Sequence, residues 1–167
     1  MARVTTLARR YCKAGVVLVT GAHHDQVADA LAETPVLTLY NKRWQEGMGT
    51  SLSAGAAAVS GTAQAVLVML TDQPFIDEAD LDHLVSAAKA DPDSIAAGAY
   101  NNTLGVPAIF PRRYLDDLKQ LHGDKGARNI ILRQSAVSEV AMPNAEFDLD
   151  TPAALAEFKK IEAKMRR

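Results

Sequence analysis

The chain has 167 residues, 48% of them apolar, which is enough to bury one core and fits a single domain over residues 1–167. Its 18 Lys and Arg residues nearly balance 20 Asp and Glu residues, and the net charge of −2 creates no general field that would attract nucleic acid or an anionic membrane. No apolar run approaches the roughly 20 residues that a membrane span requires. We therefore expect a domain that binds neither nucleic acid nor membrane.

The single cysteine, Cys12, excludes an internal disulfide, and together with four scattered histidines it supplies too few ligands for a clustered zinc site. This usage fits a reducing, cytoplasmic setting. Residues 8–19 loosely imitate a twin-arginine export signal, but Val4, Leu7 and Tyr11 follow helical spacing. We expect an amphipathic helix here, with Cys12 on its apolar stripe and no motif that would make it a nucleophile.

In chain order, the first half predicts alternating strands and helices. The predicted strands are short, uncharged and rich in Leu or β-branched residues, as strands covered on both faces are: residues 16–20, 36–40 and 65–70. The predicted helices cover residues 25–33, 50–59 and 77–90. This alternation indicates βαβ units and a mostly parallel sheet.

The second half is more mixed. Strands are predicted at residues 95–100, 106–110 and 137–142, and helices at residues 112–121, 125–134 and 152–165. Thr151 can cap the last helix, and Pro152 suits its first position. No repeat or linker divides the chain, so the prediction remains one α/β domain.

Asp72 directly follows the apolar strand at residues 65–70. In doubly wound sheets ligands bind beyond the carboxyl ends of the strands, so this carboxylate is delivered to the ligand edge. Mg²⁺ binds one or two such carboxylates together with phosphate oxygens and water. Asp72 equally fits a turn residue ahead of Pro74, and the local sequence leaves both interpretations open.

Residues 47–52 carry two glycines from a loop into a predicted helix, whose first N–H groups lack intrahelical partners. Such a helix start can accept an anion or a base carbonyl, and the glycines let a ligand approach the backbone. The pattern is neither the dinucleotide fingerprint nor a Walker A loop. The simpler interpretation makes Thr50 an N-cap after a flexible loop.

Charged residues mark two further segments. Asp148 and Asp150 would point to one side of an extended segment and could complete a metal site, or Asp150 only favours the following helix dipole. Lys125 and Arg128 fall in the first turn of a predicted helix, where the dipole disfavours cations, and such conflicts mark sites that meet an anion. The alternative is that Asp124 caps this helix and both cations are solvated. Adjacent His23 and His24 would point apart, so we interpret them as loop or helix-start residues.

Seven segments, taken together and in order, resemble the MobA-like nucleotidyltransferases, which include the molybdenum-cofactor cytidylyltransferases and guanylyltransferases. The segments are residues 19–24, 41–44, 46–52, 70–74, 105–110, 123–128 and 148–152. Their joint occurrence over nearly the whole chain is far more specific than any one segment. The resemblance implies a Rossmann-like three-layer sandwich of the nucleotide-diphospho-sugar transferase type, with a mostly parallel sheet.

The resemblance further implies an enzyme that transfers NMP from CTP or GTP to a phosphate acceptor such as molybdopterin, with Mg²⁺ and release of pyrophosphate. Asp72 would bind the metal, with Asp148 or Asp150 as a second acidic ligand, while Lys125 and Arg128 would face the acceptor phosphate. The residues implied near the nucleotide are Asn41, Gly47, Gly49, Thr50 and Ser51. Metal and cations would hold the charged groups in line and neutralise developing charge.

The sequence departs from the family in one respect. Family members begin with a strand and a loop of the form L-A-A-G-x-S-x-R-M-G-x-x-K, and these 167 residues contain neither. In the family's strand order that strand lies between the equivalents of residues 16–20 and 65–70. Because unpaired buried ladder groups are costly, we expect these two strands to close up on each other or a second copy of the chain to fill the gap.

Two alternative functions stay open: a non-catalytic nucleotide-binding or pterin-binding remnant of the fold, and a sugar-phosphate nucleotidyltransferase of the same fold. Val106 stands where family members often carry a small polar residue or histidine, which leaves the acceptor open. The base of the NTP and a homodimeric state are equally open.

Overall fold

The computed structural model describes residues 2–59 and 61–147; Asp148, Asp150 and the helix predicted at residues 152–165 lie outside this part. Its α-helices are α1 (Ala2–Tyr11), α2 (His24–Ala30), α3 (Met48–Ala58), α4 (Glu78–Ala90), α5 (Leu115–Lys119) and α6 (Arg128–Ile131). Its strands are β1 (Val17–Thr20), β2 (Leu37–Tyr40), β3 (Ala65–Val68), β4 (Ile95–Tyr100), β5 (Thr103–Pro111) and β6 (Val137–Ala141). Three short 3-10 helices complete it: η1 (Trp44–Glu46), η2 (Arg112–Tyr114) and η3 (Pro143–Glu146).

The strands form two sheets in the described part of the chain. β1 and β2 pair in parallel, and the second sheet has the order β3-β5-β4-β6, in which β5 is antiparallel to both neighbours. The prediction of a mostly parallel sheet is therefore wrong, because the larger sheet is mixed. The reason is local: Asn101 and Asn102 adopt positive φ angles of 50° and 54° in a two-residue turn, which returns β5 directly alongside β4.

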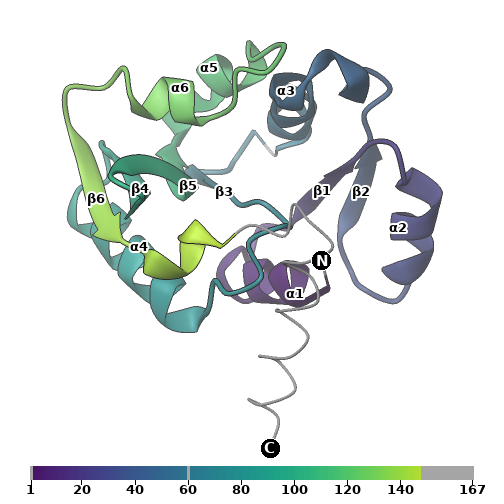
Figure 1. Cartoon of the computed structure of the whole chain (residues 1–167), viewed down its shortest axis with the longest axis horizontal. Helices are drawn as coiled ribbons and strands as arrows, with labels where there is room; N and C mark the ends of the chain where they lie inside the picture. Colours follow the sequence, from purple (N-terminus) through teal and green to yellow (C-terminus); the bar gives the residue numbers. More distant parts are fainter. Residues whose placement is uncertain (1, 60, 148–167) are drawn as a thin grey trace, which may run out of the picture.

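Helices cover both faces of the larger sheet, which confirms the layered α/β arrangement (Figure 1). One core joins α3, α5 and α6 to Ile95, Ala97 and Phe110, and the other joins α1 and α4 to Ala96 and Ile109. Neighbouring residues of β4 thus point to opposite cores, as successive side chains of a strand do. Within the described residues, none of these helices is both long and apolar enough to cross a membrane.

The amphipathic N-terminal helix is confirmed. Val4 and Leu7 of α1 are only 4% and 7% exposed, and Leu7 packs in the core that contains α4. α4 begins as expected after Asp77, whose side chain accepts the N–H of Asp80 while the Asp80 carboxylate accepts the N–H of Asp77. This reciprocal capping box holds the start of α4.

β1 and β3 do not pair with each other, so the expectation that they close up is wrong. They border a cavity of about 700 Å³ from opposite sides, with α3 above and α1 below in Figure 1. Each strand is held by its own partner, β1 by β2 and β3 by β5, and α3 also packs on β1. A second copy of the chain at this place stays a prediction.

Candidate functional site

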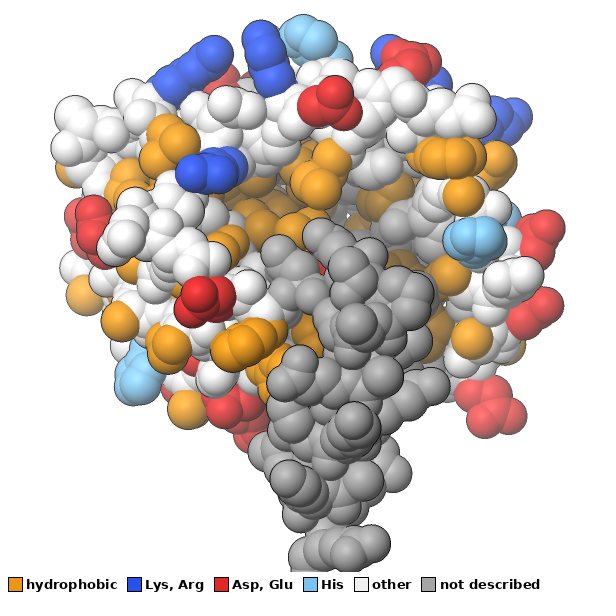
Figure 2. Space-filling view, viewed as in Figure 1, with side chains coloured by type: hydrophobic (Ala, Val, Ile, Leu, Met, Phe, Trp, Pro, Cys, Tyr) orange, Lys and Arg blue, Asp and Glu red, His pale blue; other side chains and the backbone are white. Residues whose placement is uncertain are grey.

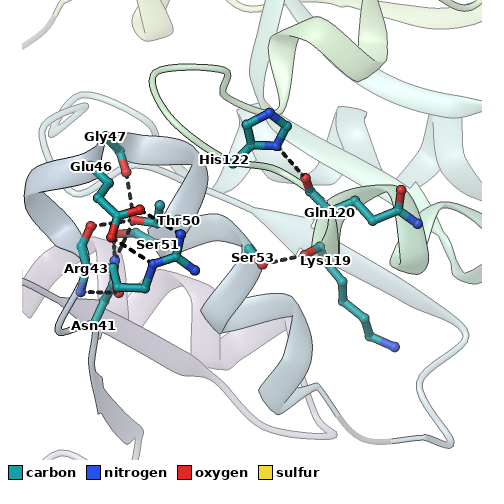
Figure 3. Close-up of polar contacts among 10 residues, drawn as sticks. All are labelled: Asn41, Arg43, Glu46, Gly47, Thr50, Ser51, Ser53, Lys119, Gln120 and His122. Carbon is teal, nitrogen blue, oxygen red and sulfur yellow. Dashed lines mark hydrogen bonds and ion pairs between the residues drawn. The ribbon is translucent and has the colours of Figure 1, made fainter.

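Asn41 organises the loop that leads from β2 into α3 (Figure 3). Its side chain is buried at 6% exposure; Nδ2 donates to Thr50 Oγ1 at 2.8 Å and to Ser51 Oγ at 3.0 Å. Its Oδ1 accepts the N–H of Arg43 at 3.0 Å. Both amide protons and the amide oxygen are thus used inside the loop, so Asn41 positions the backbone around it.

Thr50 is the third residue of α3, because the helix begins at Met48 and Gly47 is its N-cap. The interpretation of Thr50 as an N-cap is therefore wrong. Its hydroxyl lies 3.0 Å from the Arg43 carbonyl oxygen and 2.9 Å from that of Gly47, and can donate to either. Thr50 and Asn41 together tie η1 and the first turn of α3 into one buried hydrogen-bonded unit.

The two glycines allow the start of α3 to press against the loop at residues 122–125. Gly47 has a φ of 111°, and a Cβ there would lie 2.4 Å from the carbonyl carbon of Gly123. The N–H of Gly49 donates to Gly123 O at 2.8 Å, and a Cβ on Gly49 would lie 2.7 Å from Lys125 O. Two segments far apart in sequence are thus brought into backbone contact. One is predicted to bind the nucleotide, and the other is predicted to face the acceptor phosphate.

Lys125 and Arg128 are both exposed, but only Arg128 lies in a helix. α6 begins at Arg128 with Ala127 as its N-cap and no side-chain cap. The prediction of two cations in the first turn of one helix is therefore wrong, and so is the Asp124 cap of the alternative interpretation. Lys125 belongs to the preceding loop. Arg128 Nη2 donates to Thr103 Oγ1 at 2.7 Å, which directs the guanidinium toward the start of β5.

Asp72 lies in the turn that follows β3. The residue is half-buried, and its Oδ1 atom is shielded from solvent. The next residue, Gln73, is 2% exposed and donates from Nε2 to Ala145 O at 2.8 Å, which holds the turn to η3. The structure therefore supports a firmly held carboxylate near the carboxyl end of β3.

The donor chemistry at Asp72 fits a hard divalent cation, which prefers oxygen ligands and completes its shell with phosphate oxygens and water. No group of three or more His, Cys, Asp or Glu side chains that could hold a metal occurs among the residues described. A cation at Asp72 would therefore take few ligands from this part of the protein, as Mg²⁺ bound with a nucleotide does.

The cavity between β1 and β3 joins the two groups of candidate residues. Met48 and Ser51 line it from α3, and Leu70 and Thr71 line it from the turn next to Asp72. The first turn of α3 and the residues that directly precede Asp72 therefore line one space. The same cavity is lined by apolar side chains, which would exclude water around a bound ligand.

A neighbouring charge and burial shift the pKa values of two ionisable groups, Glu46 and Cys12. Arg43 donates to Glu46 from Nε at 2.9 Å and Nη2 at 2.6 Å, and this pair lowers the pKa of the exposed Glu46 carboxyl. Burial raises the pKa of the Cys12 thiol, which favours the unreactive protonated form. His24 begins α2 as expected, with Nδ1 2.7 Å from Thr20 Oγ1 and its ring stacked on Tyr40.

Sequence reasoning missed two partners of the site, Gly123 and Thr103. Gly123 accepts the Gly49 N–H and has a φ of 57°, and Thr103 accepts from Arg128. The only local sequence signal was that residue 123 is a glycine, because a left-handed backbone conformation favours glycine. Neither contact follows from spacing along the chain, because each joins segments that are far apart in sequence.

These features define an α/β domain of the nucleotidyltransferase type. Residues 1–138 match the MobA-like NTP transferase domain, and the chain belongs to this family. The resemblance stated from the seven segments is thereby confirmed. The family is one of nucleotidyltransferases whose substrate is an NTP, as the resemblance implied. Membership in the family does not identify the acceptor.

Three known proteins illustrate the relationship. Purine catabolism protein PucB of Bacillus subtilis is 30% identical over 126 residues, which cover 68% of this chain; the match spans 60% of PucB. Rv0371c of Mycobacterium tuberculosis, solved in complex with manganese, is 26% identical with a TM-score of 0.74, covering 93% of this chain and 83% of that one. The 4-diphosphocytidyl-2C-methyl-D-erythritol synthase of Anaerococcus prevotii shares the fold. It is 14% identical, with a TM-score of 0.72, and the match covers 99% of this chain and 87% of its own.

Proposed function

We propose that this domain transfers a nucleoside monophosphate from CTP or GTP to a phosphate-bearing acceptor such as molybdopterin. An oxygen of the acceptor phosphate attacks the α-phosphorus of the NTP, the bond from that phosphorus to the bridging oxygen breaks, and pyrophosphate leaves. The observation that carries the proposal is Asp72, a half-buried carboxylate after β3, in a cavity-bordering turn of a MobA-like domain.

Asp72 would hold Mg²⁺, with Asp148 or Asp150 as a second acidic ligand. The ion would supply positive charge to the phosphates of the NTP and so stabilise the charge that develops during transfer. The manganese in the Rv0371c structure supports a divalent cation in this fold.

The loop at residues 47–51 would receive the nucleotide, with the half-buried Gly47 and Ser51 partly open to solvent and the buried Gly49 acting through its contact with Gly123. Asn41 and Thr50 act through this loop, because their side chains are already bonded to its backbone and to each other. Exposed Lys125 and Arg128 would bind the acceptor phosphate. Cations placed against both reactants would hold them in line, which is most of what nucleotidyl transfer requires. We place the reaction in the cytoplasm, where the lone thiol of Cys12 stays reduced.

The test is pyrophosphate release by the full chain with Mg²⁺, with CTP or GTP as donor and molybdopterin or a sugar 1-phosphate as acceptor. We expect release with molybdopterin, and a loss of about 100-fold in rate for Asp72→Asn, because the variant removes the charge that holds the cation. Asp93→Asn, which changes an exposed carboxylate in the loop before β4, is the matched control and should keep the parent rate.

Three outcomes would contradict the proposal. Asp72→Asn with full Mg²⁺-dependent activity removes the metal assignment. Turnover with a sugar 1-phosphate alone identifies the sugar-phosphate enzyme. Binding of NTP, measured by calorimetry, with no pyrophosphate from any acceptor identifies the non-catalytic nucleotide-binding protein.

A further inference from the structure

The turn that carries Asp72 contains a buried amide that reaches two other segments of the domain. Gln73 follows Asp72 directly and is 2% exposed. Its Nε2 donates to Ala145 O at 2.8 Å and lies 3.5 Å from Tyr100 Oη, which itself donates to Val106 O at 2.7 Å. The amide is therefore held between η3 and the end of β4.

η3 is anchored to the body of the domain at two further points. The N–H of Met142 donates to Ala99 O in β4 at 3.0 Å. Asn144 Nδ2 donates to Asp80 Oδ2 at 2.9 Å, in the first turn of α4. The bond from Gln73 therefore reaches a segment that is already fixed, so this bond can fix the turn from which it comes.

A ring contact joins the same two segments a little further along the chain. The rings of Phe75 and Phe147 meet edge to face, with their centroids 5.4 Å apart. Figure 2 shows hydrophobic side chains at the surface beside η3 and the start of α4. Phe147 directly precedes Asp148 in the sequence. The turn thus lies against the end of η3, from which the chain continues to Asp148.

The amide oxygen of Gln73 is buried without a partner. Its Oε1 is shielded from solvent and meets no hydrogen-bond donor among the residues that the structure describes. A buried acceptor without a donor costs free energy, and an apolar side chain of the same shape avoids this cost. What a glutamine provides here, and an apolar residue cannot, is the directed bond from Nε2 to Ala145 O.

We propose that Gln73 is a positioning residue of the transfer site. It holds Asp72 at the separation from the end of η3 at which carboxylates of both segments bind one divalent cation. This inference rests on the proposed function, in which Asp72 and either Asp148 or Asp150 are the metal ligands. Hydrogen bonds behind metal ligands fix their orientation, and losing one typically weakens metal binding about 10–100-fold.

The test is the binding of Mn²⁺ to the full chain in the presence of CTP or GTP and without an acceptor. Enhanced relaxation of water protons reports the ion held by the protein and needs no turnover. Gln73→Met keeps an unbranched side chain but loses the N–H donor. We expect the Kd of Mn²⁺ to rise by about tenfold, because the two carboxylates no longer meet the ion in one geometry.

Gln134→Met is the matched control. Gln134 is half-buried, donates from Nε2 to Ile130 O at 3.2 Å and accepts from Tyr114 Oη at 3.1 Å. This variant loses the same kind of bond away from Asp72 and should bind Mn²⁺ as the parent does. Equal weakening in both variants would mean that any lost amide loosens the site, and would overturn the positioning role. A folded Gln73→Met chain with the parent's Kd overturns it as well.

Two further variants test the alignment itself. Gln73→Met added to an Asp148→Asn/Asp150→Asn chain should change the Kd by less than about twofold, because no second carboxylate remains to align. Effects that multiply would contradict the alignment. Phe147→Ala changes an exposed ring, so it tests the alignment even if Gln73→Met does not fold. We expect its Kd to rise about threefold, and an unchanged Kd would contradict the alignment.

Asp72→Asn separates a failure of this inference from a failure of the proposed function. It should weaken Mn²⁺ binding at least as much as Gln73→Met does. If Asp72→Asn binds Mn²⁺ as the parent does, or the parent binds none, the metal assignment of the proposed function is wrong. If Asp72→Asn binds weakly and Gln73→Met binds normally, only the positioning role is wrong.

Discussion

At the start of α3, close backbone contacts decide the shape of the loop that we propose for the nucleotide. Gly47 combines a φ of 111° with a ψ of 168°, a region that residues with a side chain rarely enter. Asn41 and Thr50 bond to the loop from its buried side. The loop is therefore built for a fixed backbone, and its glycines serve contact with residues 122–125.

Gly47→Ala should lower the free energy of unfolding by about 2–3 kcal/mol, because the new methyl group forces the backbone conformation and meets the Gly123 carbonyl. Urea unfolding followed by circular dichroism measures the change. Gly61→Ala, at a position with open space around it, should stay within about 0.5 kcal/mol of the parent. Equal effects of the two variants would mean that the contact with Gly123 contributes nothing.

Among the helices, α1 is tied to α4 by polar groups at its end as well as by its apolar stripe. Tyr11 Oη donates to Asp82 Oδ1 at 2.7 Å and lies 2.9 Å from Glu78 O, while Arg10 and Glu78 form an ion pair beside it. Burial and the Asp82 carboxylate raise the pKa of Tyr11 from 10.0 to about 12. The phenol is therefore part of the contact between the two helices in its protonated form.

This contact predicts a specific loss of stability in alkali. Because the pKa of Tyr11 is higher in the folded state, its contribution is complete below pH 10.0 and is lost as the pH rises through about 12. Tyr11→Phe should lower the unfolding free energy at neutral pH and make its decline between these two pH values shallower. Urea unfolding at several pH values measures both effects.

Tyr40→Phe is the control for the alkaline experiment. Tyr40 stacks on His24 at the edge of β2 and has no part in the contact between α1 and α4. Its variant should keep the parent's decline in alkali. A Tyr11→Phe chain with the same decline as the parent would show that this phenol does not control the alkaline stability.

At the scale of the molecule, the described residues of β1 and β2 form a two-stranded sheet apart from the four-stranded one. Two strands alone are marginally stable in water, whereas β4 and β5 are each paired on both edges and lie between two cores. We therefore expect the region around β4 and β5 to be more stable against local opening than the region around β1 and β2.

Hydrogen exchange of the isolated chain should reveal these two halves. We expect the paired amides of β1 and β2 to exchange at least about tenfold faster than those of β4 and β5, through local opening. Mass spectrometry of peptic fragments resolves the difference. Equal protection of both sheets would show that the molecule opens as one cooperative unit.

Local pattern was sufficient to predict most individual elements. Helical spacing placed Val4 and Leu7 on the buried face of α1, and predicted a helix at residues 77–90, where α4 lies. Short uncharged runs predicted β1, β2 and β3, and the joint occurrence of seven segments predicted the family. These features depend on residues within a few positions of each other, so periodicity and capping express them directly.

The arrangement of these elements depended on contacts between distant segments. The strand predicted to begin at residue 106 starts at Thr103, and the turn at Asn101 and Asn102 makes it antiparallel to β4. The contact of Gly49 with Gly123 and the cavity between β1 and β3 likewise have no local signature. The amino-acid order alone determined which segments are helices and strands and to which family they belong. Only the folded molecule decided strand direction, loop contacts and the cavity between β1 and β3, because each is set by hydrogen bonds and packing between residues that meet only in three dimensions.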